Sequence, residues 1–363
     1  GDHRDLHLSL RRQRQMCIRD RLKLEKVNIT LDSKVVLDNV NLEVSDGDIV
    51  SLMGSSASGK TSLIRSIAGF HNITSGSIYI DEKIVDDSKK REDVSKRNVG
   101  VIFQDLALFP HLTVRENICF GLNTFPKKQQ SERAEKLEEI LNIDDIKDRY
   151  PDQISGGQQQ RVAIARAIAP GPKLLLLDEP FSALDYELKE GLMNDIKKLI
   201  KSEKITAILI THSAEEAFKM SDKIAFISEN TIMQYADPYD LYHKPVSKEI
   251  ANFFGISSYI KATVMDSSHL SSVLGNFVAS TEGYNKGDEV RMLVRPDDII
   301  HDDHAMTSAK VIEKTFRGSD FLYRLELKDK QTVFCYAPSH HNHSLNEVIG
   351  VKLDLDHLIV FED

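Results

Sequence analysis

Two patterns of apolar and polar positions divide the chain, and the first covers residues 22–240. Short apolar runs such as 48–53 and 173–177 alternate there with stretches whose apolar residues recur at spacings of three and four. Such runs are typical of strands buried on both faces, and the wider spacing is typical of helices. The alternation predicts a wound α/β domain over 22–240. A helix expected over 130–141 predicts a helical subdomain at about 105–160.

The second pattern follows residue 256. Residues 257–363 alternate apolar and polar positions, as in 290–295 and 321–327, with glycines between the runs. Alternation over short runs is typical of half-buried strands. This pattern predicts an all-β module of the OB-like type over 257–363, joined to the α/β domain by a linker at 241–256.

The first 21 residues fit neither pattern. They hold six arginines against three aspartates, a net charge of +3, and show no sustained helical or strand period. A secretory signal places its charges before an apolar core, whereas five of the six arginines follow the short apolar segment 6–10. We expect residues 1–21 to be a non-native or disordered leader. The alternative is a basic arm that contacts anionic lipid or nucleic acid.

Composition narrows the class of protein. Of the 363 residues, 41% are hydrophobic and 28% are charged, which is ordinary for a globular chain and argues against disorder. No apolar run approaches the roughly 20 residues of a membrane-spanning helix. The three cysteines (Cys17, Cys119 and Cys335) are too few and too far apart for a disulfide framework or a CxxC zinc site. This usage fits a reducing cytoplasm.

The net charge argues against nucleic acid as a partner. The whole chain carries -9, and residues 257–363 alone hold 11 Lys and Arg against 17 Asp and Glu, a net -6. OB-like folds that bind single strands need a basic groove, because phosphates are recognised by clustered Lys and Arg. We therefore expect no nucleic-acid binding from the β module.

A phosphate-binding loop lies between the strand 48–53 and a helical pattern at 62–68. Its sequence fits G-x-x-x-x-G-K-T, in which backbone N–H groups surround phosphate oxygens, the lysine reaches the β- and γ-phosphates and the threonine hydroxyl binds Mg²⁺. A chance match in a Gly/Ser turn is the alternative, and the flanking strand and helix disfavour it. The predicted nucleotide-binding residues are Gly54, Ser55, Ser56, Ala57, Ser58, Gly59, Lys60, Thr61 and Ser62.

A second helix start, at Ser155, also has the character of an anion site. Ser155 and Gln158 form the pattern of a capping box, which needs no ligand. That interpretation leaves Gly156 and Gly157 unexplained, because each glycine costs a helix about 1 kcal/mol relative to alanine. Close approach of the backbone to another molecule would explain them. A second anion site in a chain with one nucleotide loop indicates that two chains meet around the nucleotide.

Polar side chains follow two further buried strands. Asp178 and Glu179 end the run of four leucines at 174–177, and His212 follows the apolar run 207–210. Open α/β sheets bind ligands at the carboxyl ends of their strands. Successive side chains on a strand point in opposite directions, so we expect Asp178 to bind the metal and Glu179 to act on the attacking water. Two acids that merely end a strand, and a purely structural histidine, are the alternatives.

In this order the motifs resemble the ATP-binding subunits of ABC transporters, specifically those of bacterial importers. By that resemblance, Gln104 is the Q-loop glutamine, residues 155–159 are the signature motif, Asp185 belongs to the D-loop, and His212 is the switch histidine. The resemblance implies a P-loop NTPase fold with a RecA-like ABC core and a C-terminal regulatory domain.

The resemblance also implies the ligands and the roles. ATP and Mg²⁺ are the expected cofactors, with Thr61, Gln104 and Asp178 around the metal and Glu179, His212 and Gln104 in catalysis. Leu31, the P-loop residues and Asp185 are expected to bind the nucleotide, together with the signature residues Ser155, Gly156, Gly157 and Gln158.

The implied partners are a second copy of the chain, integral-membrane permease subunits and, indirectly, a solute-binding protein. The implied location is peripheral, on the cytoplasmic face of the bacterial inner membrane. By resemblance, the loop at 108–110 docks a permease helix, with packing of Phe109 on the chain's own core as the alternative.

Segments at 67–70, 108–114 and 150–151 resemble ferric-iron and polyamine importers most. We therefore expect an importer ATPase for ferric iron, with polyamine or another small solute as the alternative. A soluble ABC ATPase that acts on ribosomes or nucleic acid is the alternative from another class. The single signature motif and the acidic β module disfavour it.

Three positions depart from the family pattern. Leu31 stands 23 residues before Gly54 (54 minus 31), where an aromatic ring usually stacks on the adenine, so we expect weaker nucleotide binding. Ala57 replaces a common glycine. Ser213 replaces a common aspartate after the switch histidine, and with Glu216 it is still able to cap the next helix.

Two histidine tracts in the β module remain unassigned. They are His301-Asp-Asp-His304 and His340-His-Asn-His343. Such tracts fit either a regulatory metal site or solvated loops.

Overall fold

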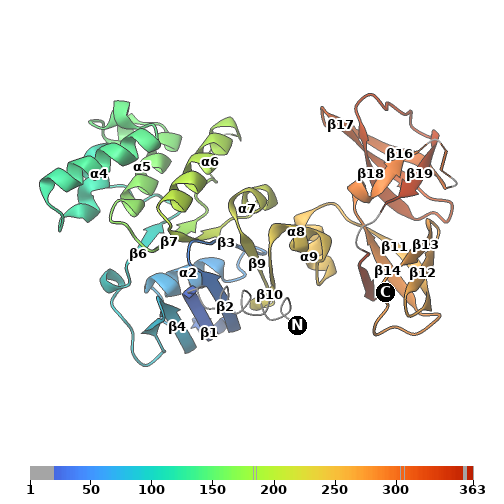
Figure 1. Cartoon of the computed structure of the whole chain (residues 1–363), viewed down its shortest axis with the longest axis horizontal. Coiled ribbons are helices and arrows are strands. Elements are labelled where there is room, and N and C mark those ends of the chain that lie inside the picture. The colour runs from blue at the N-terminus through green and yellow to red at the C-terminus, as the bar shows by residue number, and fades with distance from the viewer. Residues whose placement is uncertain are drawn as a thin grey trace, which may run out of the picture. The chain divides into compact units, whose positions relative to one another are not determined.

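The computed structural model describes residues 20–182, 184, 186–302, 304–305, 307–354 and 358–362. These residues form two compact units, one ending at Pro238 and the other beginning at Tyr239 (Figure 1). Each unit has its own hydrophobic core. Residues 1–19 of the expected leader lie outside the described residues.

The first unit is built on a six-stranded, mostly parallel sheet. Its strands are β3 (Ile49–Met53), β6 (Val99–Ile102), β7 (Leu174–Asp178), β8 (Thr206–Ile210), β9 (Lys223–Ser228) and β10 (Thr231–Ala236). Their order across the sheet is β10-β9-β3-β8-β7-β6. All neighbouring pairs are parallel except β10 and β9. Every residue of β3, β7 and β8 is buried, which confirms the strands predicted from their continuous apolar runs.

Alternate side chains of this sheet enter two different cores. In β7, Leu175 and Leu177 belong to a cluster with the helices that follow β6 in the chain. Leu174 and Leu176 belong to the cluster on the opposite face. A strand buried on both sides has no polar face, which explains its run of leucines.

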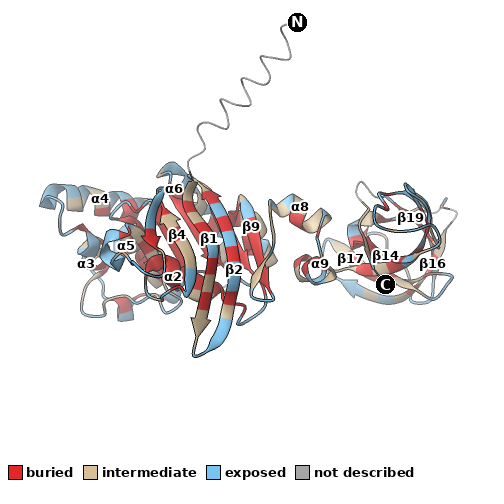
Figure 2. Cartoon of the chain, turned by 90° about the horizontal axis from the view of Figure 1, so that it is seen from below, coloured by how far each residue is buried: buried red, intermediate tan, exposed pale blue. Residues whose placement is uncertain are grey.

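A four-stranded antiparallel sheet covers the second of these clusters. Its strands are β1 (Asp20–Leu31), β2 (Lys34–Ser45), β4 (Ser75–Ile80) and β5 (Lys83–Asp86), in the order β2-β1-β4-β5. Buried positions alternate with less buried ones along β1 and β2 (Figure 2).

Strand β1 begins two residues before the expected boundary at residue 22. Asp20 and Arg21, counted above with the leader, open β1. The guanidinium of Arg21 contacts the carboxylates of Asp46, at 2.6 Å, and Asp81. These partners are distant in sequence, so the local pattern gives no sign of the pairing.

Helices follow the strands of the first unit. They are α2 (Lys60–Ala68), α3 (Val114–Cys119), α4 (Lys127–Ile140), α5 (Gly156–Ile168), α6 (Tyr186–Ser202) and α7 (Ala214–Met220). Short 3₁₀ turns lie at Val94–Lys96, Phe120–Leu122, Asp144–Ile146 and Pro151–Gln153. The helix predicted over 130–141 is confirmed as α4, which buries Ala134 and Leu137. In Figure 1, α4, α5 and α6 lie on one side of the parallel sheet. Among the described residues, no helix combines the length and the apolar character that crossing a membrane requires.

The second unit is mainly β-structure. One sheet has the order β13-β12-β11-β14-β20 and the other β15-β19-β16-β17-β18, and their buried faces share one core. The strands are β11 (Ser258–Asp266), β12 (His269–Ser272), β13 (Gly275–Val278), β14 (Glu289–Val294), β15 (Ile299–His301), β16 (Ser308–Phe316), β17 (Asp320–Glu326), β18 (Thr332–Pro338), β19 (Val348–Leu353) and β20 (Val360–Glu362). A 3₁₀ turn lies at Pro296–Asp298. This all-β architecture confirms the expected class.

The segment expected to be a linker, 241–256, is largely helical. It holds the end of α8 (Pro238–His243) and all of α9 (Lys248–Phe254). The buried guanidinium of Arg295 donates to the carbonyl oxygens of Ala251, at 2.7 Å, and Tyr242, at 3.1 Å. These bonds attach both helices to the second unit, which explains why the segment is folded.

Candidate functional site

Four neighbouring parallel strands place the predicted phosphate-loop, metal-binding and catalytic residues at one edge of the sheet. Strand β3 leads into the loop 54–59, β8 into His212, β7 into Asp178 and Glu179, and β6 into Gln104. These strands stand side by side in the order β3-β8-β7-β6, and they are parallel, so their carboxyl ends lie in a row. The fold therefore brings together residues that span more than a hundred positions of sequence.

Glycines shape the loop after β3. Gly54 has φ of 141°, and a Cβ there would lie 2.1 Å from the carbonyl oxygen of Ile227. Gly59 has φ of 97°, and its Cβ would lie 2.8 Å from Leu37. Ala57, where the family commonly has glycine, adopts a left-handed φ of 65°. This conformation costs an L-residue roughly 1–2 kcal/mol, so the loop keeps its shape at the expense of some strain.

Lys60 is folded back into the loop. Its ammonium donates to the carbonyl oxygens of Gly54, at 3.0 Å, and Ser55, at 2.7 Å, and to Ser58 Oγ at 3.1 Å. Burial lowers the pKa of Lys60, and the negative charges of Glu179 and Asp178 oppose that shift. The ammonium of Lys60 is therefore held by neutral oxygen acceptors, and the carboxylates of Glu179 and Asp178 act on it electrostatically.

The three predicted metal ligands line one hollow. Thr61 Oγ1 lies 3.4 Å from Asp178 Oδ1, and both residues, with Gln104, line a cavity of about 590 Å³. Asp178 is buried, and Gln104 is exposed. Burial raises the pKa of Asp178, and the negative charge of Glu179 raises it further. A cation in this hollow would offset both effects, and the donors are the hard oxygens that Mg²⁺ prefers.

Glu179 turns away from Asp178 and meets His212. It leaves β7 with a left-handed φ of 49°, which a non-glycine residue adopts only when its surroundings enforce it. Its N–H donates to the carbonyl oxygen of Ile210 at 3.1 Å. Glu179 Oε1 lies 2.6 Å from His212 Nε2. The two carboxylates therefore contact different neighbours, because the backbone turns at Glu179 after the strand has ended.

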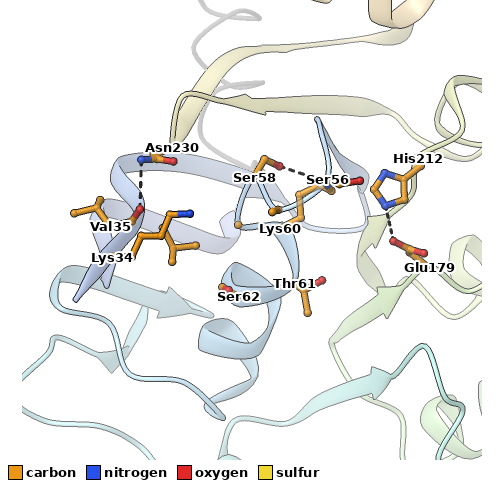
Figure 3. Close-up of a pocket in the computed structure, with 13 residues that line it drawn as sticks. Lys34, Val35, Ser56, Ser58, Lys60, Thr61, Ser62, Glu179, His212 and Asn230 are labelled. Carbon is orange, nitrogen blue, oxygen red and sulfur yellow. Dashed lines mark hydrogen bonds and ion pairs between the residues drawn. The ribbon is translucent and has the colours of Figure 1, made fainter. Parts of the chain in front are cut away.

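One pocket of about 410 Å³ is lined both by the phosphate-binding loop and by Glu179 and His212 (Figure 3). Of the predicted residues, it is lined by Ser56, Ala57, Ser58, Gly59, Lys60, Thr61, Ser62, Glu179 and His212. Figure 3 shows His212 and Glu179 on one side of the loop and Lys34 and Val35 on the other.

One wall of this pocket consists of residues that were not among the predicted site residues. Lys34, Val35, Val36 and Asn230 line it, and Asn230 Nδ2 lies 3.4 Å from the carbonyl oxygen of Val35. None of the four belongs to a motif. Leu31, expected beside the adenine, does not line the pocket. It ends β1 opposite Lys34 and packs partly against the core.

The signature residues are not part of this pocket within one chain. Ser155 is the N-cap of α5 and forms the predicted capping box with Gln158. A Cβ on Gly156 would meet no heavy atom of the described chain within 4 Å, and one on Gly157 would meet only Leu184 and Leu188, at 3.4 and 4.0 Å. The start of α5 is therefore open toward solvent. Asp185 lies outside the described residues.

The helix after His212 is capped by Ser213, as predicted, which accepts the N–H of Glu216 at 3.3 Å.

Phe109 is half-buried: its ring packs 4.2 Å from that of Phe120 and lies 5.2 Å from the guanidinium carbon of Arg166. These contacts agree with partial packing on the chain itself.

Comparisons with known proteins follow the same division of the chain. Residues 37–182 match the family model described as "ABC transporter", and residues 292–361 match the one described as "TOBE domain". The solved dimer of the ATP-binding cassette MJ0796 bound to ADP and Pi is similar to the chain, with a TM-score of 0.54 and 30% identity over 60% of this chain and 98% of the cassette.

Two curated relatives extend the similarity. The spermidine/putrescine import ATP-binding protein PotA of Roseobacter denitrificans is 38% identical, over 78% of this chain and 80% of its own length. The Fe(3+) ions import ATP-binding protein FbpC of Fusobacterium nucleatum is 36% identical, over 78% of this chain and 76% of its own length. The two relatives are of similar identity but are named for different solutes.

Proposed function

The chain belongs to the family of ABC transporter ATP-binding proteins that carry a TOBE domain, and on that premise we propose that it hydrolyses ATP to drive import through separate membrane subunits. One observation supports this proposal above the others. The phosphate-binding loop, Glu179 and His212 line a single pocket, so a nucleotide held by the loop has its terminal phosphate within reach of a base.

Nucleotide binding is assigned to the loop 54–62. Its backbone N–H groups and the start of α2 bind the phosphate oxygens, because a helix start combines free N–H donors with a positive dipole end. Lys60 exchanges the carbonyl oxygens of Gly54 and Ser55 for phosphate oxygens, which are stronger acceptors for an ammonium.

The hollow formed by Thr61, Asp178 and Gln104 fits Mg²⁺. A hydroxyl and a carboxylate oxygen already lie 3.4 Å apart there, and the carboxylate is destabilised by burial and by Glu179. When bound, the ion neutralises charge on the β- and γ-phosphates. Asp178 and Thr61 would hold it from the protein side, with Gln104 as the third ligand.

Glu179 is the general base in this proposal. It accepts a proton from the attacking water, a role typically worth 10²–10⁴-fold in rate. His212 Nε2, 2.6 Å from Glu179 Oε1, holds the carboxylate in place. The left-handed backbone at Glu179 aims the side chain across the pocket rather than toward Asp178.

The active form is a homodimer. A helix start carries N–H donors without a partner inside the helix, and at the start of α5 the Cβ position of Gly156 meets no heavy atom of the described chain within 4 Å. A second copy in head-to-tail orientation supplies this helix start to the bound nucleotide, and the similar cassette MJ0796 is itself dimeric. Ser155, Gly156, Gly157 and Gln158 then contact the partner's nucleotide, with Asp185 at the seam.

The remaining partners are permease subunits at the cytoplasmic face of the bacterial inner membrane, where the chain sits peripherally. Pro110 is exposed and Phe109 half-exposed in the loop before α3, and this loop is assigned to permease docking. A solute-binding protein acts indirectly, through the permease.

For the solute we retain ferric iron as the first hypothesis and polyamine as the second. Relatives named for each are about equally similar to the chain. The solute is selected by the permease and the binding protein, so residues of this chain do not decide between the two.

Uptake by intact cells tests both the proposed importer function, with Glu179 as its base, and the proposed solute. A strain that lacks the chain is complemented with the unchanged chain, with Glu179→Gln, or with Glu132→Gln, which alters a carboxylate exposed on α4. We expect the unchanged chain and Glu132→Gln, but not Glu179→Gln, to restore uptake of radioactive ferric iron. Restored uptake of spermidine instead supports the second hypothesis. If uptake of neither solute depends on the chain, both are wrong, and uptake driven by Glu179→Gln contradicts the assigned base.

A further inference from the structure

Three histidines from two distant segments meet in the second unit. His301 ends β15, and His341 and His343 lie in the loop between β18 and β19. One possible metal-binding nitrogen from each ring lies within 4.8 Å of the other two. His301 Nδ1 and His341 Nδ1 are 3.1 Å apart, and the ring of His343 lies 4.6 Å from that of His301.

The tautomer of His343 is set by a neighbouring carboxylate. His343 Nδ1 lies 2.8 Å from Glu347 Oε1, and this hydrogen bond is the main reason why the pKa of Glu347 is lowered. With its Nδ1–H donated, the ring carries a lone pair on Nε2. That nitrogen is buried and has no hydrogen-bond partner among the described residues. A metal-binding histidine usually donates one ring N–H to a carboxylate and binds the metal through its other nitrogen, and His343 has this arrangement.

The loop that carries two of the histidines is fixed at its backbone. The buried hydroxyl of Tyr323 donates to the carbonyl oxygen of His341 at 2.8 Å and accepts the N–H of His343 at 3.0 Å. Lys314 Nζ donates to the carbonyl oxygen of His343 at 2.8 Å and also contacts Asn342 Oδ1. Little ordering is therefore left for a ligand to impose on the loop.

We propose that His301, His341 and His343 bind a divalent first-row transition metal ion through three imidazole nitrogens, with Glu347 as the supporting carboxylate. Nitrogens at the 2.0–2.1 Å typical of Zn²⁺ stand about 3.3 Å apart in a tetrahedron. The Nδ1 pair of His301 and His341 is already near that spacing, and the third nitrogen, which lies within 4.8 Å of the others, has to approach by at most about 1.5 Å (4.8 minus 3.3). Three protein ligands leave a fourth position for water or for an exchangeable ligand.

Ligand type separates this site from the nucleotide site. Imidazole suits Zn²⁺, Cu²⁺, Ni²⁺ and Fe²⁺, whereas Mg²⁺ prefers oxygen ligands. The ion that serves ATP therefore does not compete here. The first histidine tract contributes His301 to the cluster, and the second contributes His341 and His343. His304 and His340 are exposed and are not in the cluster.

The test uses the full chain without a polyhistidine tag, stripped of metal and titrated with Zn²⁺ in competition with a chromogenic indicator, with Mg²⁺ present. We expect one strongly bound Zn²⁺ per chain. His301→Asn and His343→Asn should each lose it. Glu347→Ala should bind it about 10–100-fold more weakly, the usual effect of removing a supporting carboxylate. His269→Asn is the matched control, because His269 is exposed in the same unit and pairs with Asp266.

Equal Zn²⁺ binding by the unchanged chain and both cluster variants, or no stoichiometric binding, would overturn the proposal. Circular dichroism checks that the variants fold. The unchanged chain loaded with Co²⁺ gives a second test that needs no variant. Intense visible absorption, typical of tetrahedral Co²⁺, supports the site, and the weak spectrum of hydrated Co²⁺ contradicts it. Neither result depends on ATP hydrolysis or on the transported solute.

Discussion

Replacing Gly156 with alanine separates the two sites that the nucleotide is proposed to contact. Gly156 is the first residue of α5, and a Cβ there would meet no described heavy atom of the same chain within 4 Å. Within one chain the methyl group is therefore harmless. It should even raise the free energy of unfolding, by up to about 1 kcal/mol, because alanine favours a helix more than glycine does.

In the proposed dimer, the same methyl group projects toward the partner's γ-phosphate. A displacement of about 1 Å near reacting groups costs on the order of 100-fold in rate. This corresponds to about 2.7 kcal/mol of transition-state stabilisation. We expect Gly156→Ala to lose about 100-fold in ATP turnover while its ATP dissociation constant, measured on the monomer, stays unchanged.

Gly54→Ala is the contrasting variant. Its Cβ would lie 2.1 Å from the carbonyl oxygen of Ile227, against an ordinary contact of at least 3.4 Å, so the loop must shift by 3.4 minus 2.1, or 1.3 Å. We expect this chain to lose ATP binding itself. Fluorescence titration with a nucleotide analogue, phosphate-release kinetics and thermal unfolding separate the two outcomes. Full turnover by Gly156→Ala would refute the role of α5 across the dimer.

Three further predictions concern affinity and stability. By the resemblance the adenine lies beside position 31, although Leu31 itself does not line the pocket. If that placement is right, Leu31→Tyr should bind ATP more tightly, by roughly 1–3 kcal/mol of base stacking, in equilibrium titration; unchanged or weaker binding counts against stacking at this position. Arg97→Ala should lower the free energy of unfolding, measured in urea, by about 3–5 kcal/mol, because it leaves the buried carboxylate of Asp86 without its cation. Lys128→Ala, which removes an exposed pair with Glu132, is the control and should lower it by under about 1 kcal/mol. Burial raises the pKa of Cys335 to about 12 from 9.0, so the thiol's contribution to stability is full below pH 9 and falls as the pH rises toward 12. Urea unfolding of the unchanged chain and Cys335→Val on both sides of pH 9 measures that fall, and a pH-independent difference would contradict it.

Much of the first unit was predictable, because its signals are local. A continuous apolar run, a glycine-rich loop and a helical spacing follow one another at β3 and α2, and each has its own physical cause. The rule that parallel strands end at one edge then predicts the meeting of Asp178 and Thr61 without knowledge of their contact.

Features that depend on distant pairings were not predictable. The local sequence predicts Glu179 as the end of a strand, and no neighbouring residue indicates that it adopts a left-handed backbone. Asn230 is a plausible turn residue, but its approach to Val35 depends on how β10 and β2 are placed. The pairing of His301 with His341 likewise depends on how the end of β15 lies beside the loop between β18 and β19, which the histidine tracts do not encode.

The assembly of two chains around ATP is the central claim of this account. Sedimentation velocity of the Glu179→Gln chain with Mg²⁺, with and without ATP, tests it most directly. We predict a monomer without nucleotide, a dimer with ATP, and a monomer under both conditions when Lys60→Ala is added. A Glu179→Gln chain that binds ATP and still sediments as a monomer would contradict the claim.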